Sequence, residues 1–255
     1  MSKSDSIVLQ KSIISRLLCV KMTLRDVIYI SYALPARTLQ PLVPNVLRLA
    51  TVEGDIAFIS LVVLRSTRVR LSAFPLLKFN YNQFNIRTYV IDPVSGQFAV
   101  YFIRSGVTSR LISLATSTIG IPWQFIELRT NANMPNGLQF LSVCGNWEGP
   151  FSLRIQANAN VSMAPSFFED RKSVVDFIIR PLIGFVGDDR RLSRFTIYHP
   201  EVQPQSWSLL ELDCPLFKKL VTIEDLKRPH SIFYLPTADF SIFLPPKRIK
   251  KEGEI

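Results

Sequence analysis

Four polar side chains alternate along one short segment of the chain, Gln83, Asn85, Arg87 and Tyr89. Residues two apart share a face of an extended strand, so these four would project together, and the mostly apolar residues between them would project from the other face. An arginine can hold a carboxylate through two parallel N–H donors, with amide side chains orienting the ligand. If this face looks into the protein, the segment predicts an anion-binding pocket. If it looks outward, it is a solvated face or Arg87 forms a structural ion pair.

Further candidates lie downstream of this segment. Tyr101 and Arg104 are three apart on the next expected strand and should point to opposite faces, so only one can join Arg87, and we favour Tyr101. Arg110 opens an expected helix, where a cation opposes the helix dipole, so we expect it to have an anionic partner, and we favour a role in anchoring the backbone. His199 and His230 have no carboxylate at a recognisable spacing, and no nucleophile-elbow motif is present, which argues against a hydrolase.

The bulk composition narrows the classes of protein. A hydrophobic fraction of 47% over 255 residues is enough for a large core. Cys19, Cys144 and Cys214 are far apart, and with only two histidines they predict reduced thiols, no metal and no cofactor. No apolar run approaches the roughly 20 residues of a membrane helix, and no secretory signal is recognisable. We therefore expect a soluble, cytoplasmic protein.

The formal net charge of +10 favours an anionic partner: a nucleic acid, a membrane surface or a small organic acid. Basic residues concentrate between Arg37 and Arg110, and they include Arg65, Arg68 and Arg70. Because no aromatic stacking platform or nucleic-acid-binding module is visible, we expect no specific nucleic acid partner. A basic rim around a pocket for a small organic anion explains the charge with fewer assumptions.

The elements that must position these residues are mostly short strands separated by turns. Expected strands span 27–32, 56–64, 84–91, 97–104, 138–143, 151–157, 195–198, 206–213 and 231–234. Expected helices span 36–42, 109–119 and 166–179, the last with Ser166 as its N-cap. We expect residues 1–24 to form a partly helical lead-in, 25–246 a single domain, and 247–255 a basic, frayed tail.

Four motifs, in this order and spacing, carry a resemblance: Leu39–Pro44, Asn85–Val90, Val100–Phe102 and Gly120–Pro122. With them the chain resembles the YqjF-like family of uncharacterised proteins, in the acetoacetate decarboxylase-like superfamily, over roughly residues 25–246. The resemblance implies an α+β fold that is mainly antiparallel β: an incompletely closed β-barrel with flanking helices. It also implies a ligand pocket inside the barrel.

The resemblance also bears on chemistry. Decarboxylases of this superfamily form a Schiff base through a lysine whose pKa a neighbouring lysine lowers, and the two directly follow a Gly-Phe-Pro segment. Here Trp123 and Gln124 follow the matching Gly120–Pro122, and neither can form an imine. Gln83 and Ala33 stand where the family has an acidic residue and an arginine. The resemblance therefore argues against Schiff-base decarboxylation.

The resulting hypothesis is a barrel that binds a small organic acid, with the ligand-binding set Arg87, Gln83, Asn85, Tyr89, Tyr101, Trp123 and Gln124. Trp123 can equally be a core residue. Two alternatives stay open: an enzyme acting on a keto or enol acid without a Schiff base, using Tyr101 or His199 as acid or base, and a basic surface protein contacting nucleic acid or membrane. The sequence leaves open whether the protein is an enzyme, and it is compatible with a homo-oligomer.

Overall fold

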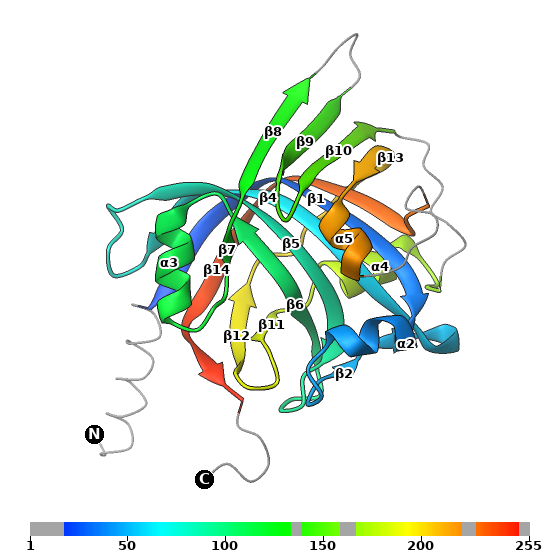
Figure 1. Cartoon of the computed structure of the whole chain (residues 1–255), viewed down its shortest axis with the longest axis horizontal. Coiled ribbons are helices and arrows are strands. Elements are labelled where there is room, and N and C mark those ends of the chain that lie inside the picture. The colour runs from blue at the N-terminus through cyan, green and yellow to red at the C-terminus, as the bar shows by residue number, and fades with distance from the viewer. Residues whose placement is uncertain (1–17, 134–138, 159–166, 221–227, 250–255) are drawn as a thin grey trace.

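A closed β-barrel is the centre of the fold (Figure 1). The computed structural model describes residues 18–133, 139–158, 167–220 and 228–249. Seven strands follow one another round the ring, and the last pairs with the first. In spatial order they are β1 (Cys19–Pro35), β4 (Ile56–Leu71), β5 (Phe79–Ile91), β6 (Phe98–Val107), β11 (Ile183–Gly187), β12 (Leu192–Tyr198) and β14 (Ser231–Arg248). All neighbours in the ring are antiparallel except β6 and β11.

A smaller antiparallel sheet lies outside the barrel, and Figure 1 shows it above the barrel strands. It contains β8 (Glu127–Asn133), β9 (Phe140–Asn146), β10 (Pro150–Ala157) and β13 (Gln205–Asp213). The sheet joins the barrel where β13 pairs with β14. Three two-residue strands complete the set, β2 (Arg48–Leu49), β3 (Thr51–Val52) and β7 (Gln124–Phe125).

Short helices flank the strands. They are α2 (Ala36–Leu39), α3 (Arg110–Thr118), α4 (Arg171–Ile178) and α5 (Pro215–Leu220), with 3₁₀ turns η1 (Gln40–Leu42) and η2 (Glu53–Asp55). Ser109 caps α3 by accepting a hydrogen bond from the Ile112 N–H, and Gly120 follows that helix with a φ of 83°. None of the helices in the described ranges is long and apolar enough to cross a membrane.

The barrel strands have two buried faces because the smaller sheet covers part of their outer side. Consecutive residues of β4 therefore enter different clusters: Leu61 packs in the outer core and Val62 in the inner one. The same alternation places Ile86 outside and Tyr89 inside. A strand buried on both faces needs an almost unbroken apolar run, which β4 has from Ala57 to Leu64.

The fold class inferred from the sequence is confirmed, and strand pairing runs round the whole ring where we expected incomplete closure. Two boundaries differ. Residues 19–24 are strand, not helix, because the apolar residues Val20, Met22 and Leu24 also repeat every second position and face the barrel interior. The strand β14 continues to Arg248, into the expected tail. Residues 1–17 and 250–255 lie outside the described ranges.

The helix expected over 166–179 is shorter in the structure. It begins at Arg171, and the Asp170 carboxylate caps it by accepting from the Ser173 N–H at 2.7 Å. An aspartate three residues before a free backbone N–H is as good a cap as a serine. Ser166, the expected cap, lies outside the described residues.

Candidate functional site

A cavity of about 70 Å³ lies inside the barrel and contains the polar segment of β5. Gln83, Asn85 and Arg87 line it together, as the alternation along the strand predicts. Tyr29 of β1 also lines the cavity. Its remaining wall is mainly apolar and includes Val62, Leu64, Phe102, Trp123 and Ile179. The combination is an apolar chamber with one permanent positive charge.

Arg87 is partly buried and lies between aromatic rings. Its guanidinium carbon is 5.2 Å from the centre of the Tyr29 ring and 5.6 Å from that of Tyr89. One nitrogen, Nη2, donates to the backbone carbonyl of Ile178 at 2.6 Å. Its Nε is buried without a hydrogen-bond partner, and none of the ion pairs between described residues includes Arg87. A charge held away from water without a counter-charge is costly, so this position favours an anion.

Two amides beside Arg87 hold each other in place. The Gln83 Nε2 donates to the Asn85 Oδ1 at 2.9 Å, and both side chains are buried. Within the described part of the chain, this bond leaves the Asn85 Nδ2 and the Gln83 Oε1 without a protein partner. The pair therefore offers one unused amide nitrogen and one unused carbonyl oxygen beside the guanidinium.

Two tyrosines supply neutral hydroxyl groups to the same chamber. Burial raises the pKa of the Tyr29 phenol, the Arg87 charge opposes that rise, and Tyr89 adds to it. Burial also raises the pKa of Tyr81 to about 12, although a hydrogen bond with Ser66 acts against it. Both phenols keep their proton at neutral pH and can donate to a ligand oxygen.

Strand pairing explains why Tyr29 lies in the site. Tyr29 pairs with Val62 of β4, and Val62 pairs with Asn85 of β5. Paired residues of neighbouring strands point to the same face, so these three form one row on the inner wall. Sequence reasoning missed Tyr29, because its alternation with Ile28 and Ile30 shows two faces without showing which is inside.

Tyr101, expected in the pocket, faces the outer core. A β-bulge lies between β5 and β6: Ile86 pairs with Arg104, but Arg87 pairs with Phe102. The extra residue shifts the alternation, so Phe102 takes the inner position, and Tyr101 and Arg104 both point outward. The Tyr101 hydroxyl donates to the Gly187 carbonyl at 2.8 Å.

Gln124 also lies outside the cavity. Its Oε1 accepts from the indole nitrogen of Trp147 at 2.8 Å and from Arg104 at 3.1 Å. Its neighbour Trp123 does line the cavity, with its ring centre 6.3 Å from that of Tyr81. Adjacent residues of an extended segment point in opposite directions, so only one of the two can enter the pocket.

Two other expectations need correction. Tyr89 lies on the same inner face as Arg87 but is fully buried behind it, where its hydroxyl and that of Ser60 are 2.8 Å apart. Among the described residues, Arg110 has an aromatic partner rather than an anion: its guanidinium carbon lies 4.8 Å from the centre of the Phe125 ring. A cation–π contact satisfies an exposed arginine without a carboxylate.

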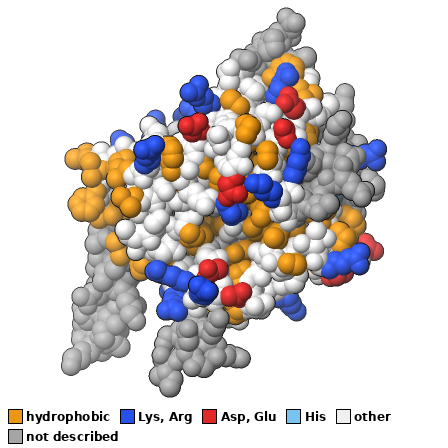
Figure 2. All heavy atoms as spheres, in the orientation of Figure 1, with side chains coloured by type: hydrophobic (Ala, Val, Ile, Leu, Met, Phe, Trp, Pro, Cys, Tyr) orange, Lys and Arg blue, Asp and Glu red, His pale blue; other side chains and the backbone are white. Residues whose placement is uncertain are grey.

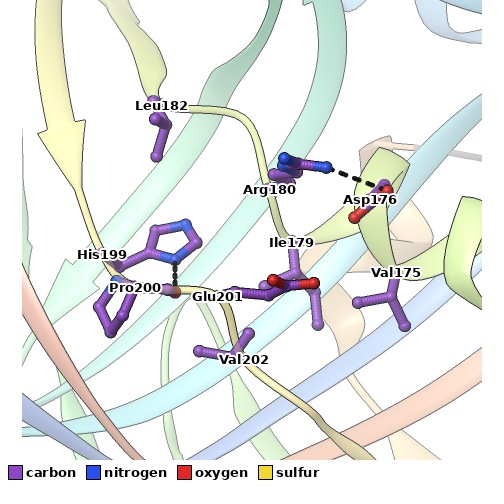
Figure 3. Close-up of a pocket in the computed structure, with 9 residues that line it drawn as sticks. All are labelled: Val175, Asp176, Ile179, Arg180, Leu182, His199, Pro200, Glu201 and Val202. Atoms are coloured by element: carbon purple, nitrogen blue, oxygen red, sulfur yellow. Dashed lines mark hydrogen bonds and ion pairs between the residues drawn. The ribbon is translucent and has the colours of Figure 1, made fainter.

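A second space of about 180 Å³, which we call the outer chamber, adjoins the cavity, because Ile179 and His199 line both (Figure 3). Figure 3 shows His199 on one side of it and the Arg180–Asp176 ion pair on the other. The His199 Nδ1 is 2.8 Å from the Pro200 carbonyl oxygen, which can only accept, so Nδ1 carries a proton. In the neutral imidazole, Nε2 is then an acceptor on a residue that lines both spaces.

The described residues contain no group of three or more His, Cys, Asp or Glu side chains that could hold a metal ion. The described polar groups that line the cavity are a guanidinium, two amides, two phenols and an imidazole. The outer chamber shares the imidazole and adds two carboxylates and a second guanidinium.

The barrel and its outer sheet place the protein in the class of acetoacetate decarboxylase-like folds. An acetoacetate decarboxylase-like enzyme from Sphingomonas wittichii RW1 aligns with a TM-score of 0.57 and 9% identity, covering 92% of this chain and 94% of that chain. The enduracididine biosynthesis enzyme MppR complexed with pyruvate aligns with a TM-score of 0.58 and 10% identity, covering 92% and 91%. Acetoacetate decarboxylase from Legionella pneumophila aligns with a TM-score of 0.57 and 12% identity, covering 91% of this chain and 87% of that chain.

At these identities the structural matches establish the fold alone. The sequence itself matches the family DUF2071, described as an uncharacterized conserved protein (COG2071), over residues 21–239. The chain therefore belongs to this YqjF-like family, as its motifs predict. No curated protein sequence matches it.

Proposed function

We propose that the barrel binds a short organic carboxylate in the inner cavity, with Arg87 as its anchor. The observation that carries this proposal is the guanidinium in the cavity wall, which has no carboxylate partner among the described residues. Its Nη1, which takes part in no hydrogen bond between described residues, and the free Asn85 amide are donors for the two oxygens of one carboxylate. The apolar wall, including Phe102 and Trp123, suits the body of the ligand.

The cavity size limits the ligand. A volume of about 70 Å³ is room for roughly five water-sized groups. A monocarboxylate of about four to six non-hydrogen atoms fits this space. A second carboxylate is disfavoured, because Arg87 is the one permanently charged cation among the described residues that line the cavity. Net positive charge would also raise the rate at which such anions arrive.

The wall supports binding without a Schiff base. No lysine is among the described residues that line the cavity, and Trp123 follows the Gly120–Pro122 segment. The relative MppR has been solved with pyruvate. Pyruvate has the size and charge inferred above, so it belongs in the first set of test ligands together with acetate and acetoacetate.

The test is calorimetric titration of these acids into the protein and into Arg87→Met. Methionine keeps the apolar stem and removes the charge, so we expect affinity to fall by about a hundredfold or more, as for other truncated charge pairs. Arg65→Met is the matched control, since Arg65 is exposed and paired with Asp26. Acetamide, which is uncharged, should bind weakly to all three proteins. Equal affinity of the protein and Arg87→Met for every acid would refute the anchor.

A second candidate function is proton exchange at the carbon next to a keto group, and His199 favours it. His199 lines both the cavity and the outer chamber, and its Nε2 is an acceptor in the neutral ring. In this reaction Nε2 takes a proton from the methyl group of bound pyruvate, the C–H electron pair forms the enolate, and the Tyr29 hydroxyl donates a hydrogen bond to the enolate oxygen. Return of a solvent proton through His199 restores pyruvate.

Deuterium exchange tests this second function. In D₂O the protein should speed the loss of the pyruvate methyl signal in proton NMR, and His199→Phe should reduce the rate by about a hundredfold or more. His199→Phe should still bind pyruvate, which separates this reaction from the binding proposal. Exchange no faster than in buffer, with pyruvate bound, would leave the protein as a binding protein.

A further inference from the structure

The turn between β4 and β5 exposes a group of large apolar side chains. Phe74 is 61% exposed, Leu76 92%, Leu77 60% and Phe79 38%. Figure 2 shows hydrophobic side chains gathered at the left edge of the molecule, where Figure 1 places this turn. Exposed apolar residues are common singly, but a contiguous group at the tip of a hairpin indicates a contact surface. We call residues 72–79 the apolar tip.

Basic residues surround the apolar tip, and acidic ones are absent from its hairpin. From Ile56 to Ile91 the sequence contains no Asp or Glu. Lys21 of β1 lies directly opposite Arg70 of β4, although like charges in paired positions destabilise a sheet. Lys21, Arg68, Arg70 and Lys78 take part in none of the ion pairs between described residues. This end of the barrel therefore combines apolar and positively charged surface.

We propose that the apolar tip docks on an anionic lipid bilayer. A bilayer surface supplies both partners at once: hydrocarbon for Leu76, Leu77 and Phe74, and negative headgroups for the surrounding Lys and Arg side chains. A second copy of the chain would bring the same positive charges together. A nucleic acid would match the charge but would leave the aliphatic side chains without an apolar partner. The contact is peripheral and does not depend on the inner cavity.

Flotation with vesicles of phosphatidylcholine, with and without phosphatidylserine, tests the proposal. We expect the full chain to bind vesicles that contain phosphatidylserine, less so at high salt. Leu76→Ser should weaken this binding by about tenfold or more, because the side chain no longer enters the hydrocarbon. Val94→Ser is the matched control, since Val94 is 71% exposed in the turn at the other end of β5.

The charge is tested in the same assay. Lys78→Ser should weaken binding by several-fold, the expected contribution of one basic side chain near an anionic surface. Arg48→Ser, at the far end of β5, is its control because Arg48 is also exposed. Since all four side chains are exposed, these variants should unfold at the same temperature as the unchanged protein, and their circular dichroism should match.

Two results would overturn the proposal. One is no binding to either vesicle, and the other is binding that Leu76→Ser leaves unchanged. If vesicle binding is absent, self-association that Leu76→Ser abolishes in ultracentrifugation would assign the apolar tip to a second copy. Tight, steeply salt-dependent binding to mixed-sequence RNA would instead assign the basic surface to a polyanion.

Discussion

The inner face of the barrel has two regions, each with one basic side chain, and the surroundings of the two side chains differ. The open region contains Arg87 and the 70 Å³ cavity. The packed region lies under α4 and contains His230 among the rings of Phe58, Phe167 and Phe168. The strands β4 and β5 contribute to both, since Phe58 and Val62 are on one strand and Arg87 and Tyr89 on the other.

The packed region is filled by aromatic side chains. The Phe177 ring centre lies 5.4 Å from Phe58, 5.1 Å from Tyr89 and 5.3 Å from Phe168. Three hydroxyl groups there satisfy one another: the Ser31 and Ser60 oxygens are 2.7 Å apart, and those of Ser60 and Tyr89 are 2.8 Å apart. The rings leave little space for a ligand, although the Ser231 Oγ and both His230 ring nitrogens have no hydrogen-bond partner among the described residues.

The two regions differ because arginine and histidine differ in whether they can lose their charge. An arginine stays charged in a protein, so Arg87 needs an anion or water and the space to admit it. A histidine can lose its proton and remain as a neutral ring in an aromatic cluster. Both ring nitrogens of His230 are buried without a partner among the described residues, and burial lowers its pKa. An unpaired polar group thus favours ligand binding in the open region and reduces stability in the packed one.

The largest expected contrast comes from removing one phenylalanine ring in each region. Phe177→Ala should lower the free energy of unfolding by about 3–5 kcal/mol, because a rigid aromatic cluster cannot close the gap. Phe102→Ala should cost only about 1–2 kcal/mol, since Phe102 is partly buried and already borders empty space. Urea denaturation monitored by circular dichroism measures both. Equal losses would show that the open region is packed as tightly as the other.

The alternation of residues along β5 allowed the open region to be predicted in part. It placed Gln83, Asn85 and Arg87 on one face, and the structure has them lining one cavity, while their ligand-binding role stays a prediction. Tyr101 was misplaced because a bulge depends on how two strands pair, which local sequence does not show. Tyr29 was missed because the alternation along its strand does not show which of the two faces is inside.

The packed region was less accessible to sequence reasoning. His230 follows a proline in what the sequence indicates is a loop, with no spacing that relates it to Phe58 or Phe168. Their contact depends on β14 pairing with β1, where Ser231 lies opposite Ser31 across a long stretch of sequence. Such contacts between distant segments need the closed barrel, which hydrophobic periodicity alone does not specify.

The smallest expected effect concerns the charge state of His230. Its folded-state pKa lies below the ordinary value of 6.5, because burial disfavours the charged ring. Between the folded-state and unfolded-state pKa values of His230, the unfolded chain binds more protons than the folded one. The free energy of unfolding is therefore unaffected by this group above about pH 6.5 and falls as the pH drops below that value. Replacing the ring with phenylalanine removes this proton and the two unpaired nitrogens, and it adds one ring atom.

His230→Phe should therefore raise the free energy of unfolding at pH 7 by about 1–2 kcal/mol, and by more at pH 5. The measurement is urea denaturation of both proteins at several pH values from 7.5 to about 5, above the range in which ordinary carboxyl groups titrate. Arg87→Met should leave the slope of stability against pH unchanged in this window, because arginine does not titrate there. If the free energy of unfolding of His230→Phe kept the same slope against pH as that of the unchanged protein, the proton taken up on unfolding would belong to another group. His230 would then be in contact with solvent or an anion, as Arg87 is in the open region.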